Sequence, residues 1–232
     1  MCSVSGGGLL RIEGLVRHFQ GIAAIAGLTL ILDDGESLGL AGGNASGKTT
    51  LIDIITGFLM PERGRVWLGA QNVTGWSSHR IVQAGIARTF QTPMVAPRVT
   101  VEQHLQAALR HRRLARRIEL REIDRSLELM ELESVRRREA WTLSPPQMRR
   151  LEIARALITG PRVLLLDEPF ASLGLDELPA IVSVLRRLRA ERLTMLVATR
   201  VDALLRALCD RVAIMEAGRV SLNPRAAGRR RA

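Results

Sequence analysis

The sequence contains no tyrosine, only four phenylalanines and a single lysine, Lys48, although lysine and arginine together number 34. Arginine therefore supplies nearly every positive charge. Its guanidinium group is a flat fork of hydrogen-bond donors, whereas the lysine ammonium group is a compact charge on a flexible stem. A chain that uses arginine throughout but keeps one lysine indicates a confined site at position 48, where the fork would not fit.

Cysteine and long apolar runs are also scarce. Cys2 and Cys209 are too few for a disulfide framework, which favours a reducing compartment. The longest apolar run, residues 22–32, is interrupted by Gly27 and Thr29 and falls short of the roughly 20 residues that a membrane-spanning helix needs. The N-terminus shows no charged region followed by an apolar stretch, so we expect no signal peptide and a cytoplasmic location.

The positive charge has two interpretations. The formal net charge is +11, and arginine clusters occupy residues 110–117, 136–138 and 229–231. Such clusters are either solvated helix faces or contacts with anionic lipid or nucleic acid. We favour solvated faces and expect no nucleic-acid partner, because the motifs below supply a partner of their own. A length of 232 residues with 47% hydrophobic residues fits one large domain.

The surroundings of Lys48 fit the pattern G-x-x-x-x-G-K-[ST] of a phosphate-binding loop: Gly42, Gly43, Asn44, Ala45, Ser46, Gly47, Lys48, Thr49 and Thr50. Glycines allow a tight turn whose N–H groups point at an anion, and the loop opens a helix whose N-terminal dipole favours phosphate. Lys48 is expected to reach the β- and γ-phosphates and Thr49 to hold Mg²⁺. An apolar strand before the loop and an apolar helix over 48–56 complete the expected context.

A second phosphate motif follows near residue 163. An apolar strand there ends in two carboxylates, Asp167 and Glu168. Asp167 is placed to bind Mg²⁺ from the strand end, opposite Thr49. Glu168 is placed to polarise an attacking water. Together the two motifs predict a protein that binds ATP with Mg²⁺.

The remaining pattern alternates strands and helices, which predicts an α/β fold with a parallel sheet covered by helices. Expected strands are residues 9–19, 22–32, 37–41, 64–68, 86–90, 162–167, 193–198 and 211–215. Expected helices are residues 78–84, 144–159, 176–192 and 201–208. Residues 100–141 are expected to be helical and charged, and the stretch interrupts the alternation as an insert.

With both motifs in place, the chain resembles the ATP-binding subunits of ATP-binding-cassette (ABC) transporters from about residue 9 to residue 220. The runs Gly85–Gln91 and Leu151–Leu157 are most similar to the branched-chain amino acid transport ATPases, with relatives for urea and other polar amino acids as alternatives. The resemblance implies a P-loop NTPase core with an N-terminal antiparallel β subdomain and an inserted α-helical subdomain. It implies a single ATP-binding domain over 9–222, with the insert at about 98–160 and a short basic tail over 223–232.

The resemblance also implies roles for four more residues. Gln91 falls in the family's glutamine loop, which senses Mg²⁺ and water. Phe19 falls where the family stacks an aromatic ring on adenine, although a core phenylalanine fits the pattern nearly as well. Ser144 and Gln147 fall at the start of the signature helix, which caps the γ-phosphate of ATP held by a second subunit.

Three positions depart from the family pattern. The signature loop reads Leu143-Ser144-Pro145-Pro146-Gln147, and proline has no N–H to donate to phosphate. Ser144 as N-cap and Gln147 as its capping-box partner should nevertheless keep the helix. Arg200 stands where the family places a catalytic histidine, and Gly174 stands where it carries Asp or Asn. These departures spare nucleotide and Mg²⁺ binding and predict slow turnover.

The resemblance implies an importer subunit that couples ATP to the transport of branched-chain or related amino acids. Its partners would be membrane permease subunits, a second ATP-binding subunit in a homo- or heterodimer and, indirectly, a periplasmic binding protein. The expected location is the inner face of the cell membrane. One alternative is a degenerate subunit that binds ATP and dimerises with little or no hydrolysis. Another is a soluble ABC protein that acts on nucleic acid.

Overall fold

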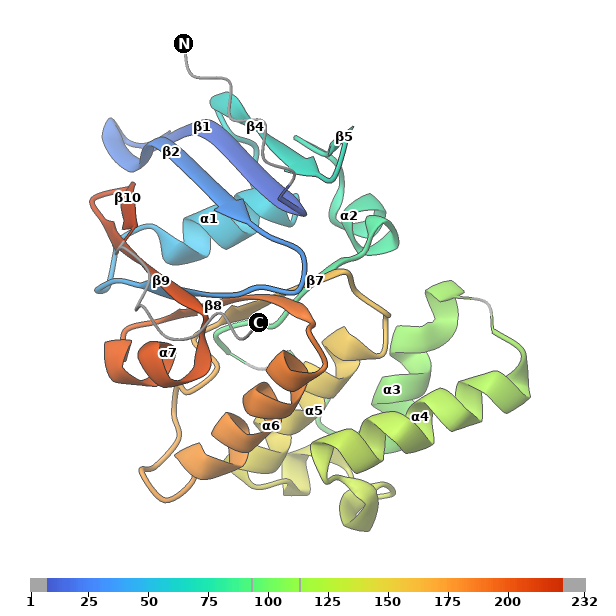
Figure 1. Ribbon diagram of the computed structural model, residues 1–232. Coiled ribbons are helices and arrows are strands. Elements are labelled where there is room, and N and C mark those ends of the chain that lie inside the picture. Colours follow the sequence, from blue (N-terminus) through green and yellow to red (C-terminus); the bar gives the residue numbers. More distant parts are fainter. Residues whose placement is uncertain (1–7, 93, 113, 223–232) are drawn as a thin grey trace, which may run out of the picture.

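The computed structural model describes residues 8–92, 94–112 and 114–222. A four-stranded antiparallel sheet with the order β2-β1-β4-β5 lies at the top of the molecule in Figure 1. Its strands are β1 (Leu10–Phe19), β2 (Ile22–Leu32), β4 (Arg63–Leu68) and β5 (Gln71–Asn72). This sheet is the N-terminal antiparallel subdomain that the family resemblance implies.

A six-stranded sheet with the order β10-β9-β3-β8-β7-β6 crosses the middle of the molecule. Its strands are β3 (Ser37–Ala41), β6 (Ile86–Arg88), β7 (Val163–Asp167), β8 (Thr194–Thr199), β9 (Arg211–Glu216) and β10 (Arg219–Leu222). All neighbours pair in parallel except β9 and β10. The α/β fold with a parallel sheet is therefore confirmed.

The register of this sheet decides where the functional side chains meet. Ala41 at the end of β3 pairs with Thr199 of β8, and Asp167 at the end of β7 pairs with Ala198. The phosphate loop, the two carboxylates and Arg200 thus emerge from one edge. Ligands of open parallel sheets bind at this carboxyl edge.

Helices cover both faces of the six-stranded sheet (Figure 1). Helix α1 (Lys48–Ile55) lies between the two sheets, where Leu51 and Ile52 join apolar residues of both. On the opposite face pack α5 (Pro145–Leu157), α6 (Leu178–Ala190) and α7 (Asp202–Leu208). Because side chains alternate along a strand, Val163 and Leu165 of β7 point toward α1 while Leu164 and Leu166 point toward α5 and α6.

The expectation of a helical stretch over residues 100–141 needs correction. The structure has two separate α-helices there, α3 (Val101–Leu109) and α4 (Arg116–Met130), and three short 3₁₀ turns, η1 (Arg110–Arg112), η2 (Glu133–Val135) and η3 (Ala140–Thr142). Thr100 caps α3 through a capping box with Gln103. Glu131 ends α4 in the left-handed conformation, with φ of 54°, which no continuous right-handed helix tolerates.

Other elements match with small shifts. Helix α2 (Ser78–Ala84) has the predicted bounds, and the strand predicted over 86–90 ends at Arg88. Strands β5 and β10 were not predicted, and β10 follows a turn at Ala217 and Gly218, both with positive φ. The basic tail 223–232 and Cys2 lie outside the described residues. Within the described part of the chain, no helix combines the length and apolar character needed to cross a bilayer.

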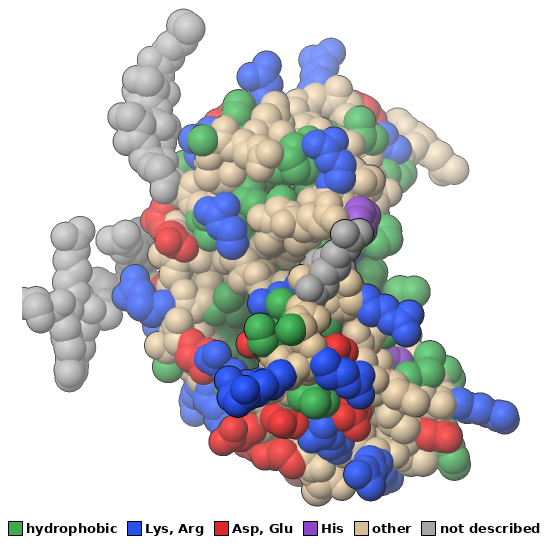
Figure 2. Space-filling view, turned by 90° about the vertical axis from the view of Figure 1, so that its right-hand side faces the viewer, with side chains coloured by type: hydrophobic (Ala, Val, Ile, Leu, Met, Phe, Trp, Pro, Cys, Tyr) green, Lys and Arg blue, Asp and Glu red, His purple; other side chains and the backbone are tan. Residues whose placement is uncertain are grey.

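The arginine clusters of the helical insert lie among acidic side chains. Figure 2 shows Lys and Arg side chains mixed with Asp and Glu over the lower part of the molecule. Arg136 hydrogen bonds to both Glu102 and Asp124, and Arg112 pairs with Glu122 at 3.3 Å. Part of the positive charge is thus neutralised within the insert itself.

Candidate nucleotide-binding site

A cavity of about 660 Å³ opens at the carboxyl edge of the parallel sheet. Residues 44–50 of the phosphate loop form its floor, and Phe19, Gln91 and Glu168 line it from three other segments. The sequence places these segments up to about 150 residues apart, and the fold brings them together. A cavity of this size suits a small-molecule ligand.

Lys48 is buried at the base of the cavity, with 6% of its surface exposed. Its Nζ donates to the carbonyl oxygens of Gly42 at 2.7 Å and Gly43 at 2.9 Å. It also lies 3.7 Å from Oε1 of Glu168. The ammonium group is therefore confined on several sides, which agrees with the retention of lysine at this position.

The two motif glycines are required by the packing. A Cβ on Gly42 would lie 2.6 Å from the Met215 carbonyl oxygen and from the Ser46 hydroxyl. Gly47 has φ of 107°, and a Cβ there would lie 2.4 Å from the Ala24 carbonyl oxygen. Both close approaches exclude a side chain. A Cβ on Gly43 would meet nothing within 4 Å, so the fold does not require glycine there.

Asp167 offers an acceptor site for a divalent cation. It is fully buried, and neither carboxylate oxygen accepts a hydrogen bond at normal geometry from the described residues. Burial raises its pKa, while the Thr49 hydroxyl and the Arg88 guanidinium act in the opposite direction. A buried carboxylate whose hydrogen-bonding capacity is left unfilled is costly, and the Arg88 guanidinium at 3.8 Å from Oδ2 offsets only part of that cost. The nearby hydroxyl and carboxylate are hard oxygen donors, which fits Mg²⁺.

Two hydrogen bonds to β8, one from the Glu168 backbone and one to its side chain, hold Glu168 beside Lys48. Its N–H donates to the Ala198 carbonyl at 2.8 Å, and its φ is 47°. The buried Thr199 hydroxyl donates to Oε2 at 3.0 Å. Oε1 faces Lys48 and lies 4.0 Å from Nε of Arg200. Thr199 is a contributor that sequence reasoning missed, since a threonine at a strand end gives no signal of its own.

Arg200 and Phe19 lie at the rim. Nη1 of Arg200 donates to the Asn44 side chain at 3.4 Å, and 57% of the arginine side chain is exposed. Phe19 is 45% exposed, and the guanidinium of Arg17 lies 5.1 Å from its ring centre. An exposed ring at the mouth of a cavity favours the stacking role over the core role.

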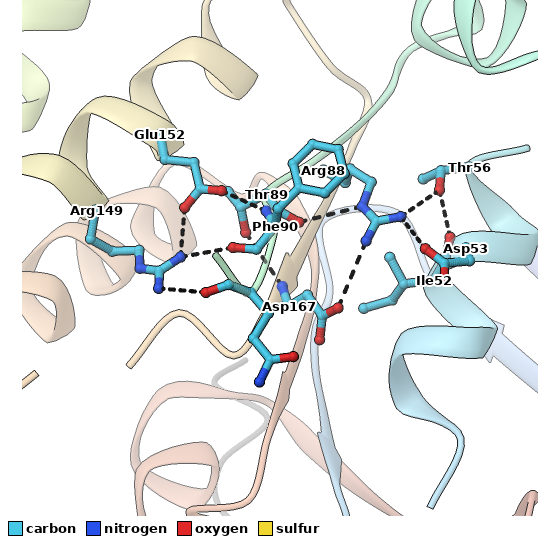
Figure 3. Close-up of polar contacts among 10 residues, drawn as sticks. Ile52, Asp53, Thr56, Arg88, Thr89, Phe90, Arg149, Glu152 and Asp167 are labelled. Carbon is cyan, nitrogen blue, oxygen red and sulfur yellow. Dashed lines mark hydrogen bonds and ion pairs between the residues drawn. The ribbon is translucent and has the colours of Figure 1, made fainter. Parts of the chain in front are cut away.

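Residues 88–91 form a polar network that the sequence did not reveal (Figure 3). Arg88 donates to Asp53 at 2.5 Å and lies 3.8 Å from Oδ2 of Asp167. From α5, the buried side chains of Arg149 and Glu152 contact the backbone of the same segment. Burial raises the pKa of Glu152, opposed by the Phe90 N–H and by Arg149.

Ser144 and Gln147 lie at the start of α5, where they form the predicted capping box. The Gln147 side chain accepts from the Ser144 N–H at 3.1 Å. Pro145 occupies the first helical position, which tolerates the missing N–H. Among the described residues lining the 660 Å³ cavity, neither Ser144 nor Gln147 is present.

The site consists of a glycine-bounded loop between a buried strand and a helix, with a buried lysine and two carboxylates opposite. This combination defines a nucleotide-binding protein of the P-loop class. The ABC transporter family model matches residues 25–171. The high-affinity branched-chain amino acid transport ATP-binding protein BraF of Pseudomonas aeruginosa is 31% identical over 227 residues, covering 90% of this chain and 89% of that protein.

Two further comparisons agree. The spermidine/putrescine import ATP-binding protein PotA of Acidothermus cellulolyticus is 34% identical over 200 residues, covering 86% of this chain and 51% of that protein. A crystal structure of the ADP conformation of MJ1267, an ATP-binding cassette of an ABC transporter, has a TM-score of 0.82 and 29% identity, covering 92% of this chain and 89% of that one. The chain belongs to the ABC transporter family, and its resemblance to the branched-chain amino acid transport ATPases is confirmed.

Proposed function

We propose that this chain is the ATP-hydrolysing subunit of an ABC importer, working with membrane permease subunits. The observation that carries the proposal is the convergence of the Lys48 loop, Gln91 and Glu168 on one cavity. Membership of the family supports nucleotide binding and ATPase activity. We propose residues 9–222 as the single ATP-binding domain.

The proposed roles follow from the contacts. Lys48 and the loop N–H groups bind the β- and γ-phosphates, and Phe19 stacks on the adenine. Thr49, Gln91 and Asp167 hold Mg²⁺, which when bound neutralises charge on the phosphates. Glu168 polarises the attacking water, with Thr199 fixing its second oxygen. Arg200 contacts the γ-phosphate as a permanent cation in place of histidine.

A second subunit completes the proposed site. Ser144 and Gln147 would face the γ-phosphate of ATP bound by that subunit, as the family resemblance implies. Their position at the exposed start of α5, apart from this chain's own cavity, supports the assignment. Whether the second subunit is a copy of this chain decides whether Pro145 and Pro146 occur in one composite site or in both.

A second cavity supports permease docking. It measures about 520 Å³ and lies between α2 and β6 on one side and α3 and α5 on the other. Phe58 lines it and is 59% exposed, and Met60 nearby in the chain is 60% exposed. Exposed apolar surface of this kind marks an interaction site. We propose it as the seat of a permease segment, which places the chain at the inner membrane face.

The transported substrate is proposed as a branched-chain or related amino acid, in line with BraF. PotA, named for spermidine and putrescine import, is similar at 34% identity. Sequence identity of this size therefore does not by itself distinguish an amino acid from a polyamine as the transported substrate. Recognition would rest with the permeases and a periplasmic binding protein.

Three measurements test the proposal. Calorimetry should show MgATP binding, and phosphate release should be lost on Glu168→Gln. Fractionation should move the chain to the membrane only when its permeases are co-expressed. No MgATP binding at millimolar nucleotide would overturn the site. Binding without any Glu168-dependent hydrolysis would instead establish the degenerate alternative.

A further inference from the structure

Helix α5 carries a buried ion pair that the proposed mechanism does not use. Nη1 of Arg149 lies 2.6 Å from Oε2 of Glu152, and the two side chains are 3% and 4% exposed. Withdrawing two charges from water is expensive, and a buried pair is often no more stabilising than apolar residues of the same size. Its presence in the middle of the molecule therefore points to a task other than stability.

The pair binds the backbone of two segments, and Figure 3 shows its contacts with the first of them, at Phe90. Oε1 of Glu152 accepts the N–H of Phe90 at 2.6 Å. Arg149 donates to the carbonyl oxygens of Phe90 at 2.9 Å, Gln91 at 3.1 Å and Ala171 at 3.5 Å. The Phe90 backbone is thus held at both its N–H and its carbonyl, and the Gln91 carbonyl is held as well. The loop that follows the carboxylates of β7 is held by the same guanidinium.

The segment is also anchored on its other side. The hydroxyl of Thr89 accepts the N–H of Asp167 at 3.3 Å, and the Thr89 N–H donates to Leu165 at 2.9 Å. Arg88 reaches Asp53 on α1. Residues 88–91 therefore connect the phosphate-loop helix and β7 to α5, and little freedom remains for the Gln91 backbone while both anchors hold.

We propose that Arg149 and Glu152 form a positioning pair that ties Gln91 and the loop after Glu168 to α5, so that these parts move together. Neither side chain is among the described residues that line the 660 Å³ cavity, so the pair acts through the backbone. Phe90 and Glu152 also line the 520 Å³ groove, so the pair lies between that groove and the nucleotide cavity. The inference rests on the proposed function, because Gln91 matters only if the cavity hydrolyses or binds MgATP.

The first test compares two substitutions of the same kind on one helix. Arg149→Lys keeps the charge but removes the fork that reaches several carbonyls. Arg150→Lys is the matched control, because Arg150 pairs with Glu131 at 2.8 Å and not with residues 88–91. Arg149→Lys should lower kcat by about 10–100-fold, as loss of an orienting partner typically does, with the KM for ATP unchanged. The control should change neither.

The second test does not depend on hydrolysis. Hydrogen–deuterium exchange of peptides covering residues 88–92 and 168–173 should quicken in both segments in Arg149→Lys and in Glu152→Gln, and in neither for Arg150→Lys. Unchanged exchange, or unchanged kcat with quickened exchange, overturns the proposal. If the wild type releases no phosphate, the proposed function fails separately. The Mg²⁺ dependence of ATP affinity then replaces kcat, and it should weaken in Arg149→Lys and in Glu152→Gln but not in Arg150→Lys.

Discussion

The phosphate loop and the start of α5, which we propose as the two halves of one composite ATP site, are built differently. Lys48 is buried and held by two carbonyls and Glu168. Ser144 and Pro145 are exposed, and the polar groups of Ser144 and Gln147 are occupied with each other. The loop lines an open cavity, whereas the start of α5 lies outside that cavity and caps its own helix.

Pro145 and Pro146 explain this second arrangement. The first N–H groups of a helix have no partner inside it and commonly bind anions. Proline removes such donors at no cost to the helix. The α5 terminus is therefore well capped, and we expect it to be a poor phosphate ligand. The comparison teaches that a segment can keep the helical structure of a motif while losing the N–H donors that the motif supplies. The predictions below test first the phosphate loop and then the start of α5.

The largest effect is expected at the loop. Lys48→Ala should weaken MgATP binding by about 4 kcal/mol, roughly a thousandfold, because the charge that meets the phosphates is lost. We expect Lys48→Arg to bind MgATP poorly as well, since Nζ lies against the carbonyl oxygens of Gly42 and Gly43 and near Glu168, where the wider guanidinium would have to be accommodated. Calorimetry measures both, with circular dichroism to confirm the fold. MgATP affinity in Lys48→Arg equal to that of the wild type would show that steric confinement is not the reason for lysine at position 48.

The next effect separates binding from chemistry. Glu168→Gln should reduce phosphate release by about 10²–10⁴-fold, the usual contribution of a general base. Nucleotide affinity should stay within a few-fold, because Lys48 is unchanged. Single-turnover hydrolysis and calorimetry on the same preparation check both. A loss of affinity equal to the loss of rate would mean that Glu168 acts by holding Lys48 in place.

The same contrast explains what sequence could predict. The phosphate loop is local: strand, loop and helix lie within residues 37–56, so its pattern fixed both its position and its chemistry. Asp167 and Glu168 follow a wholly apolar strand and were equally visible. The capping box at Ser144 was predicted because it needs only residues three apart.

Long-range partners were beyond such reasoning. Arg149 meets Gln91 across 58 residues, and Thr199 meets Glu168 across 31. An arginine and a glutamate three apart on a helix fit a solvated surface pair equally well. The division of residues 100–141 was missed because no glycine or proline lies between the end of α3 at Leu109 and the start of α4 at Arg116. The left-handed turn at Glu131 that ends α4 carries no glycine either.

A smaller effect is expected from restoring the α5 half. Pro145→Gly and Pro146→Gly with Arg200→His should raise kcat, since one donor to transferring phosphate is typically worth about 10²–10³ in rate. ATP affinity should change much less. Phosphate release by the wild type, the triple variant and the triple variant with Glu168→Gln decides it. A wild-type rate of roughly 1 s⁻¹ or faster would show that the prolines and Arg200 are adequate substitutes.

The smallest effect concerns Thr199, which binds Oε2 of Glu168 while Oε1 of the same carboxylate faces Lys48. Thr199→Val keeps the shape of the buried side chain but removes the donor to Oε2. A hydrogen bond to a charged group is worth about 1.5–3 kcal/mol, so kcat should fall by about 10–100-fold, with KM unchanged and recovery in Thr199→Ser.

The matched control is Thr194→Val at the other end of β8, where the hydroxyl accepts the Gly35 N–H at 2.8 Å. That threonine is as buried as Thr199, so its loss should lower the unfolding temperature comparably without touching the cavity. Equal kcat losses in both variants would mean that Thr199 acts through stability. A loss confined to Thr199→Val would place its hydroxyl among the groups that orient Glu168. Strand β8 would then contribute to the cavity together with the phosphate loop.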